Sequence, residues 1–104
     1  MIVEERVYTL QPGSVAEYLR LEGALGAGIY LETMGQVVGI FSSEVGELNQ
    51  ITHMVAFKDL ADRTERRTKL RSNPDWEKYA LQVRPMILRQ RSCLLIPAPF
   101  SPLR

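Results

Sequence analysis

His53 is the only histidine in this chain, and it is the first side chain whose type suits chemistry. A free imidazole has a pKa of about 6.5, so it can act as a general acid or base near neutral pH, or bind haem iron. Alternation along a predicted strand places His53 on the same face as Asn49, Ile51, Val55 and Phe57. Two interpretations remain open: His53 contacts a ligand, or it is a hydrogen-bonded polar residue of the interior. A structural zinc site is disfavoured, because no cluster of Cys and His accompanies it.

Arginine side chains are the second group that could do chemistry. Arg63, Arg67 and Arg71 follow one another at intervals of four, which places them on one face of a predicted helix. Guanidinium groups bind carboxylates and phosphates through paired hydrogen bonds, so this row could hold an anion. A solvated face that pairs with acids of the N-terminal half is the favoured alternative. Arg6 and Tyr8 share a face of the first predicted strand, where a buried arginine requires either a glutamate or a ligand.

Other candidates have a simpler structural interpretation. Trp76 begins an apolar helical stripe and is predicted to anchor the core rather than to stack on a ligand. Glu44 and Glu47 flank a predicted turn, where paired carboxylates are usually solvated. Cys93 lies in an apolar strand pattern and is expected to be inert.

The composition indicates one domain, residues 1–104, of ordinary globular type, with 45% hydrophobic and 24% charged residues. The formal net charge of +1 supplies no field that would attract nucleic acid or an anionic membrane. Residues 1–57 carry seven glutamates against two arginines, whereas residues 58–104 carry eleven basic side chains against five acidic ones. Such opposite charges suit pairing within the chain or between two copies.

The chain is expected to be cytoplasmic, because its first residues lack the basic and apolar regions of a signal peptide. A single cysteine excludes a disulfide within the chain, which is compatible with a reducing compartment. No apolar run approaches the roughly 20 residues that a membrane span needs. We expect no metal and no cofactor.

The elements that must position these side chains follow the order β-α-β-β-α-α-β. Ser14 and Glu17 form a capping-box pattern at the start of the first helix, and glycines weaken its second half. Asp59 and the pair Asn73-Pro74 are suited to begin the next two helices. The predicted strands are 2–10, 36–43, 48–57 and 90–96, and the predicted middle helix is 60–71, with a helical face of Trp76, Ala80, Val83 and Ile87 after it.

This order is typical of an α+β, ferredoxin-like fold with a four-stranded antiparallel sheet and helices on one face. Residues 97–104 form an extended, proline-rich tail. The strand 36–43 is apolar on both faces, with Val37 and Phe41 on one and Val38 and Ile40 on the other. The sheet face without helices therefore needs a cover, and a second copy in a two-fold dimer is the simplest one.

The chain resembles the NIPSNAP family, small domains of the dimeric α/β-barrel superfamily. The residues that carry the resemblance span nearly the whole chain: 5–13, 38–39, 44–53, 62–67, 73–76 and 84–85. The resemblance implies a ferredoxin-like fold and dimerisation through the sheets, forming a dimeric α/β barrel. It implies no agreed reaction.

Three functions follow as alternatives. The first is a dimeric barrel whose pocket binds a small apolar or carboxylate-bearing ligand. The second is a cofactor-independent monooxygenase or isomerase that uses His53 as the candidate catalytic residue. The third is a scaffold for protein partners, with Phe100 in the tail as its contact. The candidate ligand-binding residues are Arg6, Tyr8, Asn49, His53, Arg63, Arg67 and Trp76.

Overall fold

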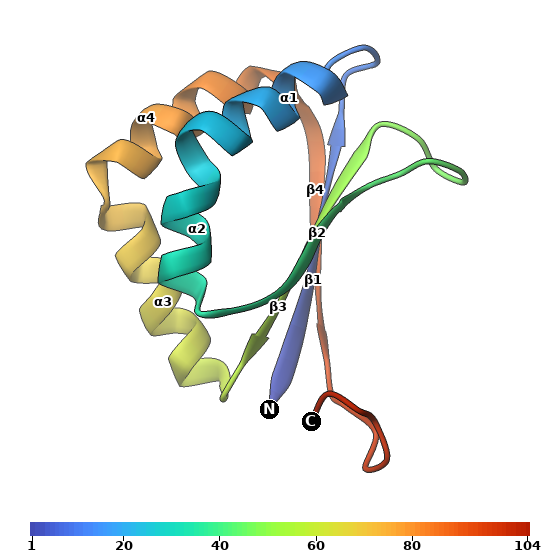
Figure 1. Ribbon diagram of the computed structural model, residues 1–104, viewed down its shortest axis with the longest axis vertical. Helices are drawn as coiled ribbons and strands as arrows, with labels where there is room; N and C mark the ends of the chain where they lie inside the picture. The colour runs from blue at the N-terminus through green and yellow to red at the C-terminus, as the bar shows by residue number, and fades with distance from the viewer.

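A twisted four-stranded antiparallel sheet forms one layer of the molecule, and the helices cover one of its two faces (Figure 1). The computed structural model describes all residues, 1–104. The strand order across the sheet is β2-β3-β1-β4, which is the ferredoxin-like arrangement predicted from the sequence. The strands are β1 (Ile2–Leu10), β2 (Gln36–Ser42), β3 (Gln50–Phe57) and β4 (Ile87–Leu95).

The helical layer contains two long stretches. The first is continuous from Val15 to Met34 but includes one wide π turn, and the second bends at Asn73. Its segments are α1 (Val15–Leu21), the π turn η1 (Glu22–Gly26), α2 (Ala27–Met34), α3 (Leu60–Ser72), α4 (Pro74–Val83) and the 3-10 turn η2 (Arg84–Met86). The π turn falls where glycines lower helix propensity, which is where the sequence predicted a weakened helix.

Two of the three predicted helix caps are confirmed. The Asp59 carboxylate accepts a hydrogen bond from the Asp62 backbone N–H at 2.8 Å, and the Asn73 side chain accepts one from the Asp75 N–H at 2.9 Å. The capping box at Ser14 was wrong, because Ser14 already has helical backbone angles and its side chain caps no N–H. Glu17 pairs instead with Arg20, one turn along the same helix.

The fourth strand begins three residues earlier than predicted. Pro85 cannot continue a helix, so α4 ends at Val83 and the chain is extended from Ile87 onward. Ile87 therefore lies in β4, opposite Leu10, and not on the helical face that the spacing predicted. The third strand begins later than predicted, because Asn49 has a left-handed backbone with a φ of 63°.

A bulge between Val37 and Gly39 changes which β2 side chains face the helices. Val37 and Ile40 both pack against the buried core, so the predicted separation of these two residues was wrong. Phe41 stays 51% exposed on the other side of the sheet, which we call the open face. Leu95 is also exposed there, because it pairs with Val3 and not with a residue of the helix-covered face.

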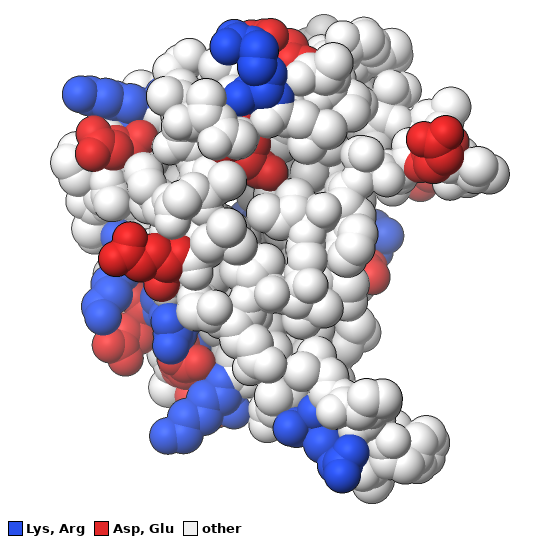
Figure 2. All heavy atoms as spheres, in the orientation of Figure 1, with Lys and Arg blue, Asp and Glu red and all other residues white.

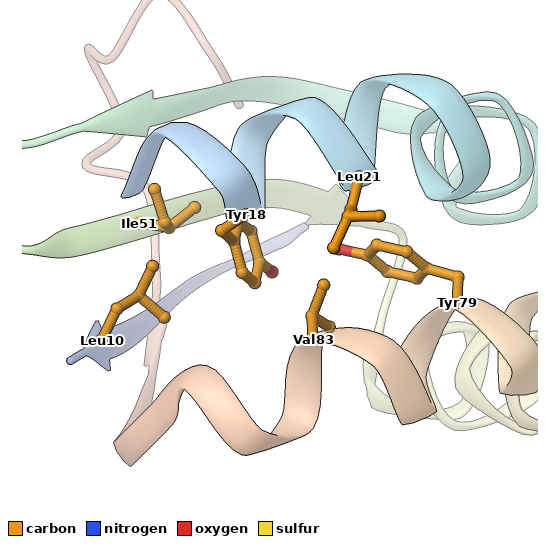
Figure 3. Close-up of a cluster of buried hydrophobic side chains, with 6 residues drawn as sticks. All are labelled: Leu10, Tyr18, Leu21, Ile51, Tyr79 and Val83. Carbon is orange, nitrogen blue, oxygen red and sulfur yellow. The ribbon is translucent and has the colours of Figure 1, made fainter. Parts of the chain in front are cut away.

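The core lies between the sheet and the helices as two neighbouring clusters. Trp76 packs against both of them, which confirms its prediction as a core anchor. One cluster is drawn in Figure 3: Leu10, Tyr18, Leu21, Ile51, Tyr79 and Val83. The other consists of Tyr30, Met34, Val55, Phe57 and Leu70.

Charged side chains of both signs alternate over the helical layer (Figure 2). The opposite charges of the two halves of the chain meet in three ion pairs. Arg63–Glu4 joins α3 to β1, Arg91–Glu5 joins β4 to β1, and Arg89–Glu47 joins β4 to the loop between β2 and β3. The charge asymmetry thus serves pairing within the chain. No helix combines the length and the apolar composition that a membrane crossing requires.

Candidate ligand pocket between the sheet and the helices

A cavity of about 150 Å³ lies between the helix-covered face of the sheet and the helices. All four tyrosines of the chain, its only tryptophan and its only histidine line this cavity: Tyr8, Tyr18, Tyr30, Tyr79, Trp76 and His53. The other lining residues are Glu22, Arg67, Ala80, Val83, Arg84, Ile87 and Gln90. The lining residues come from both the sheet and the helices.

Aromatic rings form most of the cavity wall. The His53 ring lies between Tyr8 and Tyr30, with ring centroids 5.5 Å and 5.2 Å away. Trp76 stacks on Tyr30 at 5.7 Å and contacts the Tyr79 ring at 4.9 Å. Flat faces and polar ring edges of this kind favour a planar occupant.

Glu22 places a buried carboxylate against this wall. Its side chain oxygen Oε2 lies 2.8 Å from Nε2 of His53 and accepts hydrogen bonds from the hydroxyls of Tyr18 at 3.3 Å and Tyr79 at 3.2 Å. Burial raises the pKa of both phenols, and the neighbouring Glu22 carboxylate raises it further, so both hydroxyls keep their protons. Three donors therefore converge on one oxygen of a residue that is only 5% exposed.

Sequence reasoning missed Glu22, although a signal for it exists. Tyr18, Glu22, Gly26 and Tyr30 are spaced by four, so the glutamate stands inside the apolar stripe of the first helix. A carboxylate in such a stripe must find donors in the interior. The glycines around Glu22 were interpreted only as residues that weaken the helix, and this requirement was not inferred.

One nitrogen of His53 is left without a partner. The residue is 3% exposed, and its Nδ1 is the one buried polar side-chain atom of the chain that makes no hydrogen bond. With the Nε2 proton donated to Glu22, Nδ1 carries the free lone pair of the neutral ring. The predicted hydrogen-bonded interior histidine is confirmed by the Nε2 contact, and its second nitrogen has no partner in the chain.

The arginines of α3 have different partners. Arg63 donates to Glu4 from Nε at 3.1 Å and from Nη2 at 3.0 Å, and Arg66 donates to Asp62 at 2.9 Å. Arg67 makes no ion pair and no side-chain hydrogen bond, although it is half-buried and lines the cavity. Burial, and then the nearby Arg6, lower the pKa of Arg67, whereas the Glu4 carboxylate acts in the opposite direction without forming an ion pair with it.

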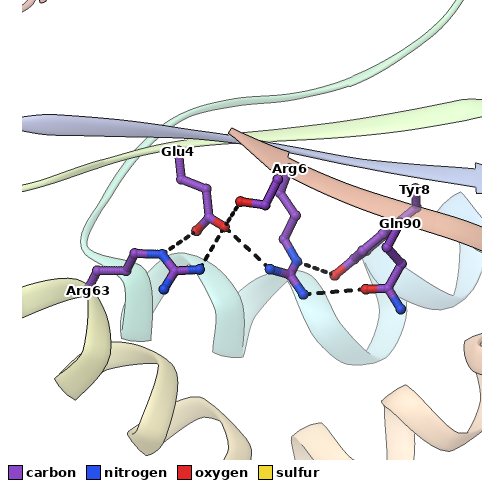
Figure 4. A network of polar contacts seen from close by, with 6 residues as sticks. Glu4, Arg6, Tyr8, Arg63 and Gln90 are labelled. Carbon is purple, nitrogen blue, oxygen red and sulfur yellow. Dashed lines mark hydrogen bonds and ion pairs between the residues drawn. The ribbon is translucent and has the colours of Figure 1, made fainter. Parts of the chain in front are cut away.

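Glu4 is the centre of a polar network beside the cavity (Figure 4). Besides Arg63, it accepts hydrogen bonds from Arg6 at 3.3 Å and from the Ser92 hydroxyl at 2.5 Å. Burial acts to raise the pKa of Glu4, but the hydrogen bonds and charges of these partners dominate and lower it to about 2. Arg6 also donates to Tyr8 at 2.8 Å and to Gln90 at 3.4 Å, so it borders the cavity through two of its lining residues.

Comparison with known proteins places the chain in a family. The family model described as NIPSNAP matches residues 3–102. The chain belongs to the NIPSNAP family. NipSnap homolog 2 of Danio rerio is 32% identical over 104 residues, which cover 99% of this chain and 35% of the relative. Protein NipSnap of Drosophila melanogaster is 30% identical over 101 residues, covering 97% of this chain and 36% of the relative. The chain thus spans about a third of the length of these NipSnap proteins.

Solved structures agree with this NIPSNAP assignment. A NIPSNAP family protein of unknown function from Agrobacterium tumefaciens has a TM-score of 0.96 and 38% identity, covering 100% of this chain and 94% of its own. A putative antibiotic biosynthesis monooxygenase from Nitrosomonas europaea has a TM-score of 0.69 at 8% identity, covering 96% of this chain and 100% of its own. At that identity the similarity shows a shared fold alone.

The predicted site residues of this NIPSNAP chain fall into three groups. Tyr8, His53, Arg67 and Trp76 line the cavity. Arg6 borders it. The other two stand apart: Arg63 is held by Glu4, and Asn49 lies in the exposed loop before β3. No group of three or more His, Cys, Asp and Glu side chains is arranged to hold a metal ion.

Proposed function

We propose that this NIPSNAP chain binds a small planar carboxylate in the cavity between the sheet and the helices. The observation that carries the proposal is Arg67, a half-buried guanidinium at an aromatic cavity that makes no ion pair and no side-chain hydrogen bond. Burial of an unpaired charge is costly, and an anionic ligand would remove that cost. His53 and Gln90 add hydrogen-bonding groups that can orient the ligand.

The size of the cavity limits the ligand. A cavity of about 150 Å³ compares with the engineered apolar cavity of about 150 Å³ that holds benzene. Pockets for drug-sized ligands measure roughly 300 to 1,000 Å³. The volume therefore suits one ring, or a chain of similar size, and is too small for haem or a flavin. Nε2 of His53 is also engaged by Glu22, which argues against haem ligation.

A binding experiment with two matched probes tests this proposal. Benzoate and benzamide have nearly the same shape, but only benzoate offers a carboxylate to Arg67. We expect benzoate to bind at least tenfold more tightly, because a hydrogen bond to a charged group contributes about 1.5 to 3 kcal/mol. The measurement is isothermal titration calorimetry, supported by native mass spectrometry of the purified protein for any ligand that copurifies.

Arg67→Gln is expected to abolish the preference for benzoate without loss of folding, because Arg67 holds no other part of the chain. Arg71→Gln is the matched control, since Arg71 is exposed on the same helix one turn further and does not line the cavity. Equal affinity for both probes in the wild-type protein, or a preference that survives Arg67→Gln, would contradict the proposal.

We also propose that two copies of the chain associate through the open face. Exposed Phe41 and Leu95 lie on this face, and no helix covers it (Figure 1). A second open face would bury these side chains in a two-fold contact. The alternative role of a protein scaffold, based on exposed Phe100 in the tail, stays a prediction.

A further inference from the structure

We infer that Glu22 and His53 form a proton-transfer pair that interconverts the keto and enol forms of a small 2-oxo carboxylate in the cavity. In this pair Nδ1 of His53 is the base, and Glu22 is the positioning residue. The inference rests on the proposed function, because the substrate would occupy the cavity and place its carboxylate on Arg67.

The geometry holds the imidazole in one orientation. Glu22 Oε2 lies 2.8 Å from Nε2 of His53, and the hydroxyls of Tyr18 and Tyr79 hold the same oxygen. Both members of the pair are buried, so neither side chain can rotate freely into solvent. A carboxylate that accepts from Nε2–H selects the tautomer in which Nδ1 is unprotonated.

The unpartnered Nδ1 is the observation that points to chemistry. Leaving a buried polar atom without a hydrogen bond is unfavourable by about 1 to 3 kcal/mol. Nδ1 of His53 is the one buried side-chain atom of the chain in this unfavourable state, and His53 lines the cavity. An imidazole that a carboxylate orients through one nitrogen, and whose other nitrogen has no partner, has the arrangement of a general base.

Two charged side chains of the cavity, Glu22 and Arg67, can stabilise the charges that the proposed proton transfer creates. Glu22 would stabilise the imidazolium that forms when Nδ1 takes a proton, and Arg67 would stabilise the anionic substrate. Tyr8 and Tyr30 flank the His53 ring, and Glu22 holds its Nε2. The other charged and phenolic side chains that line the cavity with His53 are Tyr18, Arg67, Tyr79 and Arg84.

The proposed step moves one proton and requires no oxidant or cofactor. Nδ1 removes a proton from C3 of the 2-oxo acid, next to the ketone. The C–H electron pair becomes the C2–C3 double bond, and the ketone π electrons move to the oxygen. Protonated Nδ1 then gives its proton to that oxygen, which yields the enol and restores the neutral imidazole. A reversal in heavy water would place deuterium on C3.

The test combines a spectroscopic and a chemical readout. Because His53 is the only histidine, ¹⁵N NMR of histidine-labelled wild-type protein reports this ring alone. We expect one tautomer, protonated at Nε2 and unprotonated at Nδ1. Proton NMR in heavy water then follows the loss of the C3 hydrogens of 2-oxobutanoate. We expect His53→Gln to slow this exchange at least about 100-fold, the usual contribution of general acid–base catalysis.

Glu22→Gln preserves the shape of the side chain and removes its charge. We expect at least tenfold slower exchange and nitrogen signals of His53 that move toward a mixture of tautomers, which a purely structural role would not cause. Glu32→Gln is the control, because Glu32 is exposed on the same helical stretch and lies outside the cavity. Its exchange rate should equal that of the wild type.

The outcomes separate this inference from the binding proposal. Absence of benzoate binding to the wild type would overturn the binding proposal and this inference with it. Benzoate binding combined with equal exchange in wild type and His53→Gln would overturn the proton-transfer inference alone. A wild-type His53 protonated at Nδ1 would overturn it without any variant.

Discussion

Glu4 and Glu22 are both buried glutamates, but their partners give them different roles. Glu4 is surrounded by the positive charges of Arg6 and Arg63 and by the Ser92 hydroxyl. Glu22 has two phenols and one imidazole, and no arginine. The first arrangement neutralises a carboxylate and ties β1 to α3. The second places a carboxylate against the imidazole of a residue that lines the cavity.

The Glu4 network predicts a pH-dependent contribution to stability. Its pKa is about 2 in the folded chain against 4.5 for the free side chain. The folded pKa is the lower one, so the stabilisation is full above pH 4.5 and is lost as the pH falls toward 2. Its size is roughly 3 kcal/mol at neutral pH.

Glu4→Gln is therefore expected to lower the free energy of unfolding by roughly 3 kcal/mol at pH 7 and by progressively less below pH 4.5. Urea unfolding as a function of pH measures this difference. Glu5→Gln is the control, because Glu5 lies on the open face and pairs with the exposed Arg91. A constant difference between wild type and Glu4→Gln across the pH range would contradict the assignment.

At the scale of elements, the first helical stretch connects the core to the site. Its π turn, Glu22–Gly26, begins at the carboxylate and ends at the glycine that contacts Tyr79. A Cβ atom on Gly26 would lie 2.8 Å from the Tyr79 ring, and that ring is buried. The absence of a side chain here lets the Tyr79 hydroxyl reach Glu22.

Gly26→Ala is expected to destabilise the protein by about 1 to 3 kcal/mol, because the new methyl group overpacks the core. Gly28→Ala is the matched control, since a Cβ there meets no atom within 4 Å. Alanine in that helical position should stabilise the protein by about 0.5 to 1 kcal/mol. Chemical unfolding followed by circular dichroism distinguishes the two. A change of the same sign and similar size at both glycines would refute the steric argument.

At the scale of the whole molecule, the proposed dimer depends on the apolar side chains of the open face. Phe41→Lys is expected to convert a dimer into a monomer, because a desolvated lysine cannot replace the apolar contact of a phenyl ring. Native mass spectrometry measures the change. Leu81→Lys is the control, since Leu81 is similarly exposed but lies on α4, away from this face.

The single cysteine gives a second measure of assembly. Cys93 pairs with Glu5 in the sheet, on the open face, and it is exposed in the single chain. Its exposure differs from the buried environment that the apolar strand pattern suggested. In a dimer it would react slowly with a thiol reagent, and in Phe41→Lys it would react quickly. A monomeric wild-type protein in which Cys93 reacts rapidly would contradict the dimer proposal.

The sequence alone determined the features that depend on near neighbours in the chain. The caps at Asp59 and Asn73 and the order of elements follow from interactions over a few residues, and the structure confirms them. These features are local because backbone hydrogen bonds and side-chain spacing repeat over short distances. The similarity to the NIPSNAP family was visible at this level too.

Only the tertiary structure determined which side chains come together at the cavity. The bulge in β2 turned Ile40 toward the helices, and no residue type in that strand required it. Glu22 meets His53 across 31 residues and Tyr79 across 57. Arg63 and Arg67 lie on the same helix, but Arg63 has the Glu4 carboxylate of β1 within hydrogen-bonding distance and Arg67 has no such partner. Contacts at such separations depend on how the helices pack on the sheet, because that arrangement brings donors and acceptors of distant segments within hydrogen-bonding distance.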